Sequence, residues 1–353
     1  MTNRELLDSG ISVLKEAGIE DAETDARILF EYVTGLDRSA LLLHGGDEIS
    51  EEHISPGHAG NIGKAAEYDG KGMADDGKAG PYDGKGMSDD KKDGAGSGKG
   101  GQSVKEIYDS LIAERAGHRP VQYITGMADF MGLRFRVNEN VLIPRFDTEF
   151  LVEEMMREVG DGSAVLDMCT GSGCILLSLM RYKNGIKGTG ADISRAALET
   201  AEENEKLIFG PAAAESPDAA GMDPADGNGF YAHGKAEWIL SDMFEGITER
   251  YDYIVCNPPY IRSDEIGTLM PEVRDHEPHR ALDGDADGLK YYRIIAKEAG
   301  KYLRKYGKLF LETGYDEGKE VSALLEESGF SDIQVLKDYS GNDRVVIAVK
   351  TAE

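Results

Sequence analysis

An apolar and aromatic run that is typical of a buried strand leads directly into Asn257-Pro258-Pro259-Tyr260. Because proline cannot donate to a sheet ladder, we expect the strand to end at Asn257. In an open α/β sheet, ligands bind in the crevice beyond the carboxyl ends of the strands. There the Asn257 side-chain oxygen and the Pro258 carbonyl could accept both hydrogens of a planar NH2 group, while Tyr260 packs on its plane. The pattern predicts a site for an NH2-bearing substrate, and an ordinary Asn-Pro turn is the alternative.

A glycine-rich turn follows the first predicted core strand and opens a helix. Its residues are Asp167, Met168, Cys169, Thr170, Gly171, Ser172 and Gly173. Gly171 and Gly173 would let the backbone approach a ligand closely, and the helix amides would face that ligand. The dinucleotide pattern Gly-x-Gly-x-x-Gly is incomplete, because Leu176 occupies the place of the third glycine. This departure weakens an interpretation as a pyrophosphate site.

Carboxylates end three successive predicted strands. Asp167 suits a cationic amine, and Asp192 could accept both hydroxyls of a ribose. Asp242 would lie with Met243 near an adenine ring. Each aspartate alone could also be a helix cap or a turn residue. Together, however, they favour S-adenosylmethionine as the cofactor over a dinucleotide.

The alternation of strands and helices in the C-terminal part predicts an α/β sheet that positions these residues. The predicted parallel strands are 165–168, 188–192, 238–240, 251–256 and 309–311, and an antiparallel hairpin of 333–336 and 345–349 ends the sheet. The helices between them should begin near Gly173, Ser194, Gly288 and Glu317. Another helix, capped by Asp147 or Thr148, should follow a hairpin formed by 130–137 and 141–143.

Composition divides the chain into domains. Helical periodicity predicts a small N-terminal helical domain at 1–118, interrupted by a disordered insertion rich in Gly, Asp and Lys at 56–103. A connecting hairpin and linker would occupy 119–150. The cofactor-binding domain would span 151–353, with a surface insertion at 210–235. The insertion at 56–103 carries a near repeat of two copies, which is too few for a solenoid.

Charge and targeting signals restrict the partners. The chain has 66 acidic and 39 basic side chains and a net charge of -27. Its field would repel a phosphate backbone, so we expect no direct nucleic-acid substrate. We find neither a signal-peptide pattern nor an apolar run of membrane-spanning length, and we therefore expect a cytoplasmic monomer that binds no membrane.

Metal sites are not expected. The three cysteines lack zinc-finger spacing and should be reduced thiols. The run 283–288 imitates the start of a calcium loop, but Ile294 stands where a bidentate glutamate is needed. His276, Glu277 and His279 could be drawn as a metal cluster, but Pro278 prevents a helical arrangement of their side chains.

With these residues in place, the chain resembles the family of peptide chain release factor glutamine methyltransferases over about residues 120–349. The resemblance is carried by the stretches 120–126, 141–145 with 148–149, 167–173, 257–260, 277–278 with 281–282, 287–289 and 343–346. The motif Asn-Pro-Pro-Tyr alone is shared with enzymes that methylate amino groups of adenine or guanine. The stretch 141–149 is the more specific signal. The chain departs from the family at Cys169, where glycine is usual, and at Phe146, where proline is usual.

The resemblance implies a class I S-adenosylmethionine-dependent methyltransferase fold, with a Rossmann-like seven-stranded sheet, antiparallel last strands and an N-terminal substrate-recognition domain. It implies methyl transfer to the glutamine side-chain nitrogen of the Gly-Gly-Gln motif in release factors, in support of translation termination. Asn257, Pro258 and Tyr260 would be catalytic, Pro259 would bind substrate, and Asn257 would also contact the cofactor. Arg145 either steers an acidic group of the partner or forms an ion pair at a helix terminus.

Other functions remain open at this stage. An amino-group methyltransferase could act instead on a ribosomal-protein glutamine or on a nucleic-acid base, but the latter should show a basic face. A nicotinamide oxidoreductase is disfavoured by the missing third glycine. A cofactor-binding adaptor without turnover would carry the same motifs.

Overall fold

The computed structural model describes residues 1–50, 102–210 and 235–351. Almost all of the two insertions predicted at 56–103 and 210–235 lies outside these ranges. The chain divides into two compact units, Met1–Gly117 and His118–Glu353. In the part of the chain that is described, no helix has the length and apolar character needed to cross a membrane.

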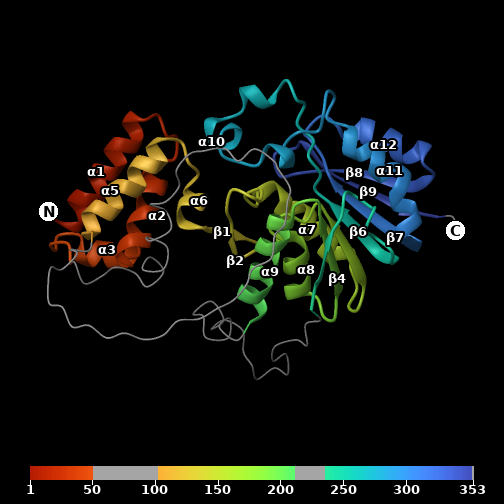
Figure 1. The fold of residues 1–353 in the computed structure, drawn as a ribbon, viewed down its shortest axis with the longest axis horizontal. Coiled ribbons are helices and arrows are strands. Elements are labelled where there is room, and N and C mark those ends of the chain that lie inside the picture. Colours follow the sequence, from red (N-terminus) through yellow and green to blue (C-terminus); the bar gives the residue numbers. More distant parts are fainter. Residues whose placement is uncertain (51–101, 211–234, 352–353) are drawn as a thin grey trace, which may run out of the picture. The chain divides into compact units, whose positions relative to one another are not determined.

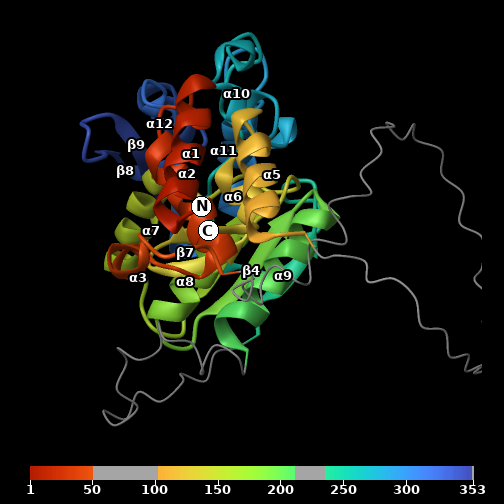
Figure 2. The same cartoon turned by 90° about the vertical axis from the view of Figure 1, so that its left-hand side faces the viewer.

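The first unit contains the predicted N-terminal helices. They are α1 (Asn3–Glu16), α2 (Ala22–Thr34), α3 (Arg38–His44) and α5 (Val104–Ala116). Thr2 and Ser103 are the N-caps of α1 and α5, and both form capping boxes. In each box the cap hydroxyl accepts from the main-chain N–H of a glutamate in the first turn, and that glutamate side chain accepts from the main-chain N–H of the cap residue. Figure 2 shows α1, α2 and α5 packed side by side as a bundle.

The second unit opens with α6 (Val121–Thr125) and the hairpin of β1 (Met127–Phe130) and β2 (Leu133–Arg136). The predicted pairing of 130–137 with 141–143 is wrong. Met131 and Gly132 have φ values of 52° and 70°, which form a tight two-residue turn and pair β1 directly with β2. Val141 and Ile143 are buried without belonging to a strand.

The second unit is built on a seven-stranded sheet, as predicted. Its strands are β3 (Ala164–Met168), β4 (Lys187–Asp192), β5 (Glu237–Leu240), β6 (Tyr251–Cys256), β7 (Leu303–Glu312), β8 (Phe330–Lys337) and β9 (Asp343–Lys350). Their order is β5-β4-β3-β6-β7-β9-β8. β3 to β7 are parallel, and β9 is antiparallel to β7 and β8. The chain order reverses at β3, so the carboxyl ends of β3 and β6 flank a topological switch point.

Helices cover both faces of the sheet (Figure 1). One face carries α7 (Phe146–Glu158), α8 (Cys174–Tyr182) and α9 (Arg195–Phe209), and the other carries α11 (Lys290–Tyr302) and α12 (Gly318–Glu327). Short helices η4 (Ile266–Thr268), α10 (Pro271–Arg274) and η5 (His279–Ala281) lie between β6 and α11. This arrangement confirms the predicted Rossmann-like seven-stranded sheet with antiparallel last strands, together with the N-terminal helices.

The start of α7 differs from the prediction. The helix begins at Phe146, with Arg145 at the N-cap and no side-chain cap, whereas Asp147 or Thr148 was expected to cap it. Both lie in the first helical turn because they have tertiary partners there. Asp147 forms an ion pair with Arg344 (3.0 Å), and the buried Thr148 side chain accepts a hydrogen bond from Asn257.

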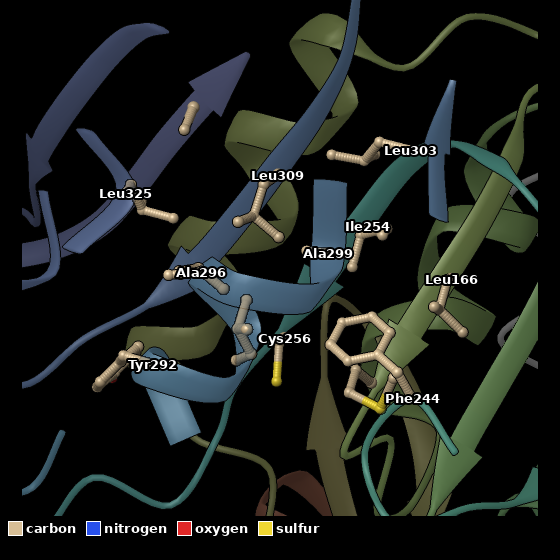
Figure 3. Packing of buried hydrophobic residues seen from close by; sticks show 14 of the residues in the cluster. Leu166, Phe244, Ile254, Cys256, Tyr292, Ala296, Ala299, Leu303, Leu309 and Leu325 are labelled. Atoms are coloured by element: carbon tan, nitrogen blue, oxygen red, sulfur yellow. The ribbon is translucent and has the colours of Figure 1, made fainter. Parts of the chain in front are cut away.

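The strands are held by two apolar layers, one on each face. In β3, Val165 belongs to the cluster under α7 and α8, while Leu166 belongs to the cluster under α11. Figure 3 shows Leu166, Ile254 and Leu309 from three strands gathered with α11 in the latter cluster. Because side chains alternate across a strand, these contacts fix the register and hence the position of each strand end.

Candidate active site

A pocket opens at the carboxyl ends of β3, β4, β5 and β6, at the topological switch point. The empty space in it, together with the open solvent at its mouth, is about 970 Å³. A pocket at a topological switch point is a common place for a small-molecule or cofactor site. Ten of the predicted site residues line it, and they are Arg145, Cys169, Thr170, Gly171, Ser172, Asp192, Asp242, Met243, Asn257 and Pro259. The tertiary structure thus gathers residues from positions 145 to 259 around one cavity.

Four predicted site residues do not line the pocket. Asp167 is fully buried, and Gly173 forms the N-cap of α8 with a φ of 77°. Pro258 is buried, and the Tyr260 hydroxyl donates to Glu312 Oε1 (3.3 Å). Tyr260 therefore directs its polar end into the protein, and its predicted stacking on a substrate stays a prediction.

The glycine-rich turn forms a smooth wall of the pocket. Gly171 has a φ of 55°, and a Cβ atom added there would meet no other protein atom within 4 Å. Cys169 also lies in the left-handed region, with a φ of 60°, in the place where the family usually has glycine. The backbone can therefore approach a ligand closely at Gly171.

Asp192 ends β4 and is tied to the glycine turn. Its Oδ2 accepts from the Gly171 main-chain N–H (2.9 Å), and its Oδ1 accepts from that of Ser194 (2.8 Å). Burial raises the pKa of Asp192, although these main-chain donors oppose the shift. Each carboxylate oxygen keeps a lone pair for a hydroxyl donor. This geometry suits a ribose, as the sequence predicted.

Asp167 is the penultimate residue of β3 and carries a buried carboxyl group beside the pocket wall. Its Oδ2 accepts from the Thr170 hydroxyl (2.6 Å), while Oδ1 has no hydrogen-bond partner among the described residues. Burial raises its pKa to about 7. A cationic group bound near Thr170 would favour the ionised form, so Asp167 fits the predicted amine site by its charge rather than by lining the cavity.

Asn257 is oriented by Thr148, which the sequence predicted as a possible helix cap and not as a site residue. Its Nδ2 donates to Thr148 Oγ1 (3.3 Å), and Thr148 is only 3% exposed. The amide oxygen is therefore left for a donor entering the pocket, which both residues line. One signal in the sequence could have pointed to Thr148, because it lies in the stretch 141–149 that carried the resemblance.

Arg145 forms an ion pair with the buried carboxylate of Glu277 and also lines the pocket. Burial raises the pKa of Glu277, and the charge of Arg145 opposes the shift. Of the two alternatives for Arg145, the structure shows an ion pair, but with a distant residue rather than within the helix terminus.

The pocket residues that were not predicted as site residues include Ile193, Arg280 and Tyr291. Ile193 follows Asp192 directly and is 55% exposed, so an apolar group bound beside Asp192 would cover it. The charge of Arg280 lowers the pKa of Asp192 against the effect of burial. Arg280 and Tyr291 lie far from the predicted strand ends, and Ile193 follows a strand end but is an apolar side chain without a motif, so sequence reasoning missed all three.

The residues fit S-adenosylmethionine on these grounds. The Gly171 wall leaves room for a ligand, Asp192 offers paired acceptors, and Asp167 carries an unpartnered buried oxygen. Ile193 and Met243 supply apolar surface. Asn257 follows the carboxyl end of β6, and its side-chain oxygen is free to accept a hydrogen bond.

The chain is similar to several known proteins. Residues 5–56 match the PrmC N-terminal domain family. The release factor glutamine methyltransferase of Agrobacterium fabrum is 42% identical over 243 residues, covering 67% of this chain and 76% of that protein. The protein of the same name from Cereibacter sphaeroides is 33% identical over 348 residues, covering 99% and 98%. A solved protein-(glutamine-N5) methyltransferase (release factor-specific) from Alicyclobacillus acidocaldarius is 27% identical, covering 62% of this chain and 100% of its own, with a TM-score of 0.33.

Proposed function

Because the chain belongs to the release factor glutamine methyltransferase family, an enzyme family that uses S-adenosylmethionine, we propose that it methylates the side-chain nitrogen of the glutamine in the Gly-Gly-Gln motif of release factors. Bound S-adenosylmethionine supplies an electrophilic methyl group on a sulfonium centre. The residues that would hold it are those of the glycine-rich turn with Asp192, Asp242 and Met243.

The observation that carries the proposal is the orientation of Asn257. Because its amide nitrogen donates to Thr148, its oxygen is available to accept one N–H of a glutamine side chain. The Pro258 carbonyl follows the end of β6, and no main-chain donor to it is found in the described ranges; it would accept the second N–H. Two acceptors would hold the NH2 group in one plane and favour the positive charge that it develops during transfer.

The chemistry needs orientation more than a strong base. An amide nitrogen is a poor nucleophile because its lone pair is delocalised. Alignment of this nitrogen with the methyl group should lower the barrier by on the order of several kcal/mol, as alignment does for other oriented reactants. The methylated amide is very acidic and can release its proton to water. Asn257 and Pro258 would therefore act by holding the nucleophile. Tyr260 would support the turn formed by residues 257–260 from inside the protein.

The partner is proposed to be a release factor alone. The net charge of -27 would oppose a direct contact with nucleic acid, and we propose a monomer that acts in the cytoplasm, where translation factors occur. Arg145 would contact the partner only through the part of its guanidinium that Glu277 leaves free.

Mass spectrometry of a release factor before and after incubation with the enzyme and S-adenosylmethionine tests the proposal. We expect one added methyl group on the Gly-Gly-Gln glutamine, and none when that glutamine is replaced by alanine. A ribosomal protein and a DNA duplex in parallel reactions cover the alternative substrates. Methylation of either one, with an unmodified release factor, would overturn the assignment.

A further inference from the structure

The side chain of Asn204 is fully buried in α9, outside the pocket, and has no part in the function proposed above. Its Oδ1 accepts from the Arg136 main-chain N–H (2.6 Å). Its Nδ2 donates to the main-chain oxygens of Arg136 (3.0 Å) and Ser172 (2.9 Å). An asparagine amide has one oxygen and two N–H groups, so all of them are used. One side chain therefore joins β2 to the glycine-rich turn.

Both ends of this connection lead to walls of the pocket. Ser172 lines the pocket as part of the glycine-rich turn. Arg136 ends β2, and the chain continues from there into the stretch 140–145, most of which lines the pocket. The two walls share no strand or helix, so their spacing depends on tertiary contacts. Asn204 supplies such contacts to both.

A second residue on the same face of α9 holds the segment that leads into the pocket. Thr200 is buried four positions before Asn204, and residues at this spacing lie on one face of a helix. Thr200 Oγ1 accepts from Asn138 Nδ2 (3.1 Å), and Asn138 Oδ1 accepts from the main-chain N–H of Asn140 (2.9 Å). This face of α9 thus holds the segment 136–140 at two points.

The glycine-rich turn also approaches α9 closely. A Cβ atom added to Gly173 would lie 3.2 Å from the Ala201 Cβ, so no side chain separates the turn from the helix there. On the side of β4, Asp192 accepts from the Gly171 main-chain N–H (2.9 Å). The turn is therefore fixed between β4 and α9, and the hydrogen bond to Ser172 gives its contact with α9 a direction.

We propose that Asn204 is a positioning residue, which sets the spacing between the glycine-rich turn and the segment 136–145 and so keeps the pocket at the width that S-adenosylmethionine needs. Without its N–H groups, two main-chain oxygens would be left unpaired in the interior, which is costly. The walls of the free protein would move to satisfy them, and binding would have to restore the spacing at the expense of affinity. The inference rests on the cofactor site of the proposed function, but not on the methyl acceptor.

Calorimetric titration with S-adenosylmethionine, without any acceptor, tests the role. Asn204→Asp keeps the side-chain shape and an acceptor for Arg136, but it offers at most one hydrogen where two oxygens need one each. We expect its Kd to rise about tenfold or more, as loss of buried hydrogen bonds predicts.

The matched control for this titration is Asn3→Asp. Asn3 is also buried, in α1, and its Nδ2 donates to the His44 main-chain oxygen (3.0 Å). Its loss should change the Kd for S-adenosylmethionine by less than about twofold, because distant sites act independently. An Asn204→Asp variant that is folded by circular dichroism and changes the Kd as little as this control would overturn the proposal.

Hydrogen exchange in the wild-type chain tests the same coupling without a substitution. If the hydrogen bonds of Asn204 favour the spacing that binds the cofactor, then cofactor binding must favour these hydrogen bonds, because coupling is reciprocal. Saturating S-adenosylmethionine should therefore slow the exchange of the Arg136 main-chain N–H. The control is the main-chain N–H of Ala164, which donates to Asp252 Oδ2 (2.9 Å) at the start of β3, outside the pocket. It should be slowed less. No slowing at Arg136, or equal slowing of both, would contradict the coupling even if Asn204→Asp did not fold.

Steady-state kinetics separates positioning from a simple loss of folded enzyme, once the methyl acceptor is established as described above. Loss of folded enzyme lowers kcat per total chain and leaves the KM for S-adenosylmethionine unchanged. In Asn204→Asp we expect the KM to rise in step with the Kd, while kcat at saturating cofactor stays within about threefold of the wild type. A lower kcat with an unchanged KM would reject the positioning role even though methylation of the release factor had been observed.

Discussion

The Asn257 side-chain nitrogen lies 3.3 Å from the Thr148 hydroxyl, although 109 positions separate the two residues in the chain. Thr148 belongs to the first turn of α7, and Asn257 follows β6. This contact joins the stretch 141–149, which is the most specific part of the family resemblance, to the turn at 257–260, which the sequence predicts to bind substrate. It turns a flexible amide into an oriented acceptor.

Replacing Asn257 by alanine should remove methyl transfer and leave cofactor binding nearly intact. The substitution deletes one of two proposed acceptors for the substrate NH2 group, and a loss of about a hundredfold or more in kcat is expected for a transition-state donor or acceptor. Steady-state methylation assays and cofactor titration measure the two effects. The exposed Asn184, in the loop after α8, provides the control Asn184→Ala, which should behave as the wild type. Full activity of Asn257→Ala would remove this residue from the mechanism.

Substituting Gly171 by alanine should weaken cofactor binding at least tenfold, since a Cβ would stand where no protein atom lies within 4 Å in the pocket wall. Gly126→Ala is a matched control. Gly126 also has a positive φ (72°) and open space around its Cβ position, but it lies outside the pocket. Both variants should lose about 1 kcal/mol of unfolding free energy through left-handed strain. Equal cofactor affinities in the two variants would show that Gly171 does not face the cofactor.

Cofactor affinity should fall as the pH drops through the raised pKa of Asp192. The ionised carboxylate accepts two main-chain N–H groups and would also accept the ribose hydroxyls, whereas the protonated form loses part of this capacity. Asp192→Asn should bind S-adenosylmethionine about tenfold or more weakly, as expected for loss of a charged acceptor, and its pH profile should be less steep, with the contribution of Asp167 remaining. Calorimetric titrations between pH 5 and 8 measure both quantities. An Asp192→Asn profile that kept the wild-type slope would assign the titration to another group.

Glu312→Gln should become more stable relative to the wild type as the pH rises. The folded-state pKa of Glu312 is raised to about 7, so between its unfolded value and pH 7 the folded protein retains a proton that the unfolded chain releases. The contribution of Glu312 to stability is therefore present at low pH and is lost by about pH 7. Glutamine does not titrate. Between pH 5 and pH 8, denaturant unfolding should move the difference by roughly 2 kcal/mol in favour of the variant. A constant difference would mean that Glu312 is not protonated in the folded state.

The sequence alone determined the fold class and most of the predicted site residues that line the pocket. Alternation of apolar strands with helices located the seven strands of the sheet, and the rule that ligands bind at carboxyl ends of parallel strands placed Asp192, Asp242 and Asn257 together. These are local signals, because strand ends and glycine turns are written in consecutive residues. The pairing of β1 with β2 and the start of α7 were wrong, since a two-residue turn at Met131 and Gly132 and the partners of Asp147 and Thr148 decided them.

Only the tertiary structure decided which side chains face the cavity and which lie behind it. Tyr260 and Asp167 stand within motifs that predict direct contact, yet Tyr260 bonds to Glu312 and Asp167 is fully buried. Glu312 had no motif of its own, because its contact with Tyr260 joins residues that lie 52 positions apart in the chain. Side-chain direction follows from packing across several elements, and one position in a sequence does not encode those neighbours.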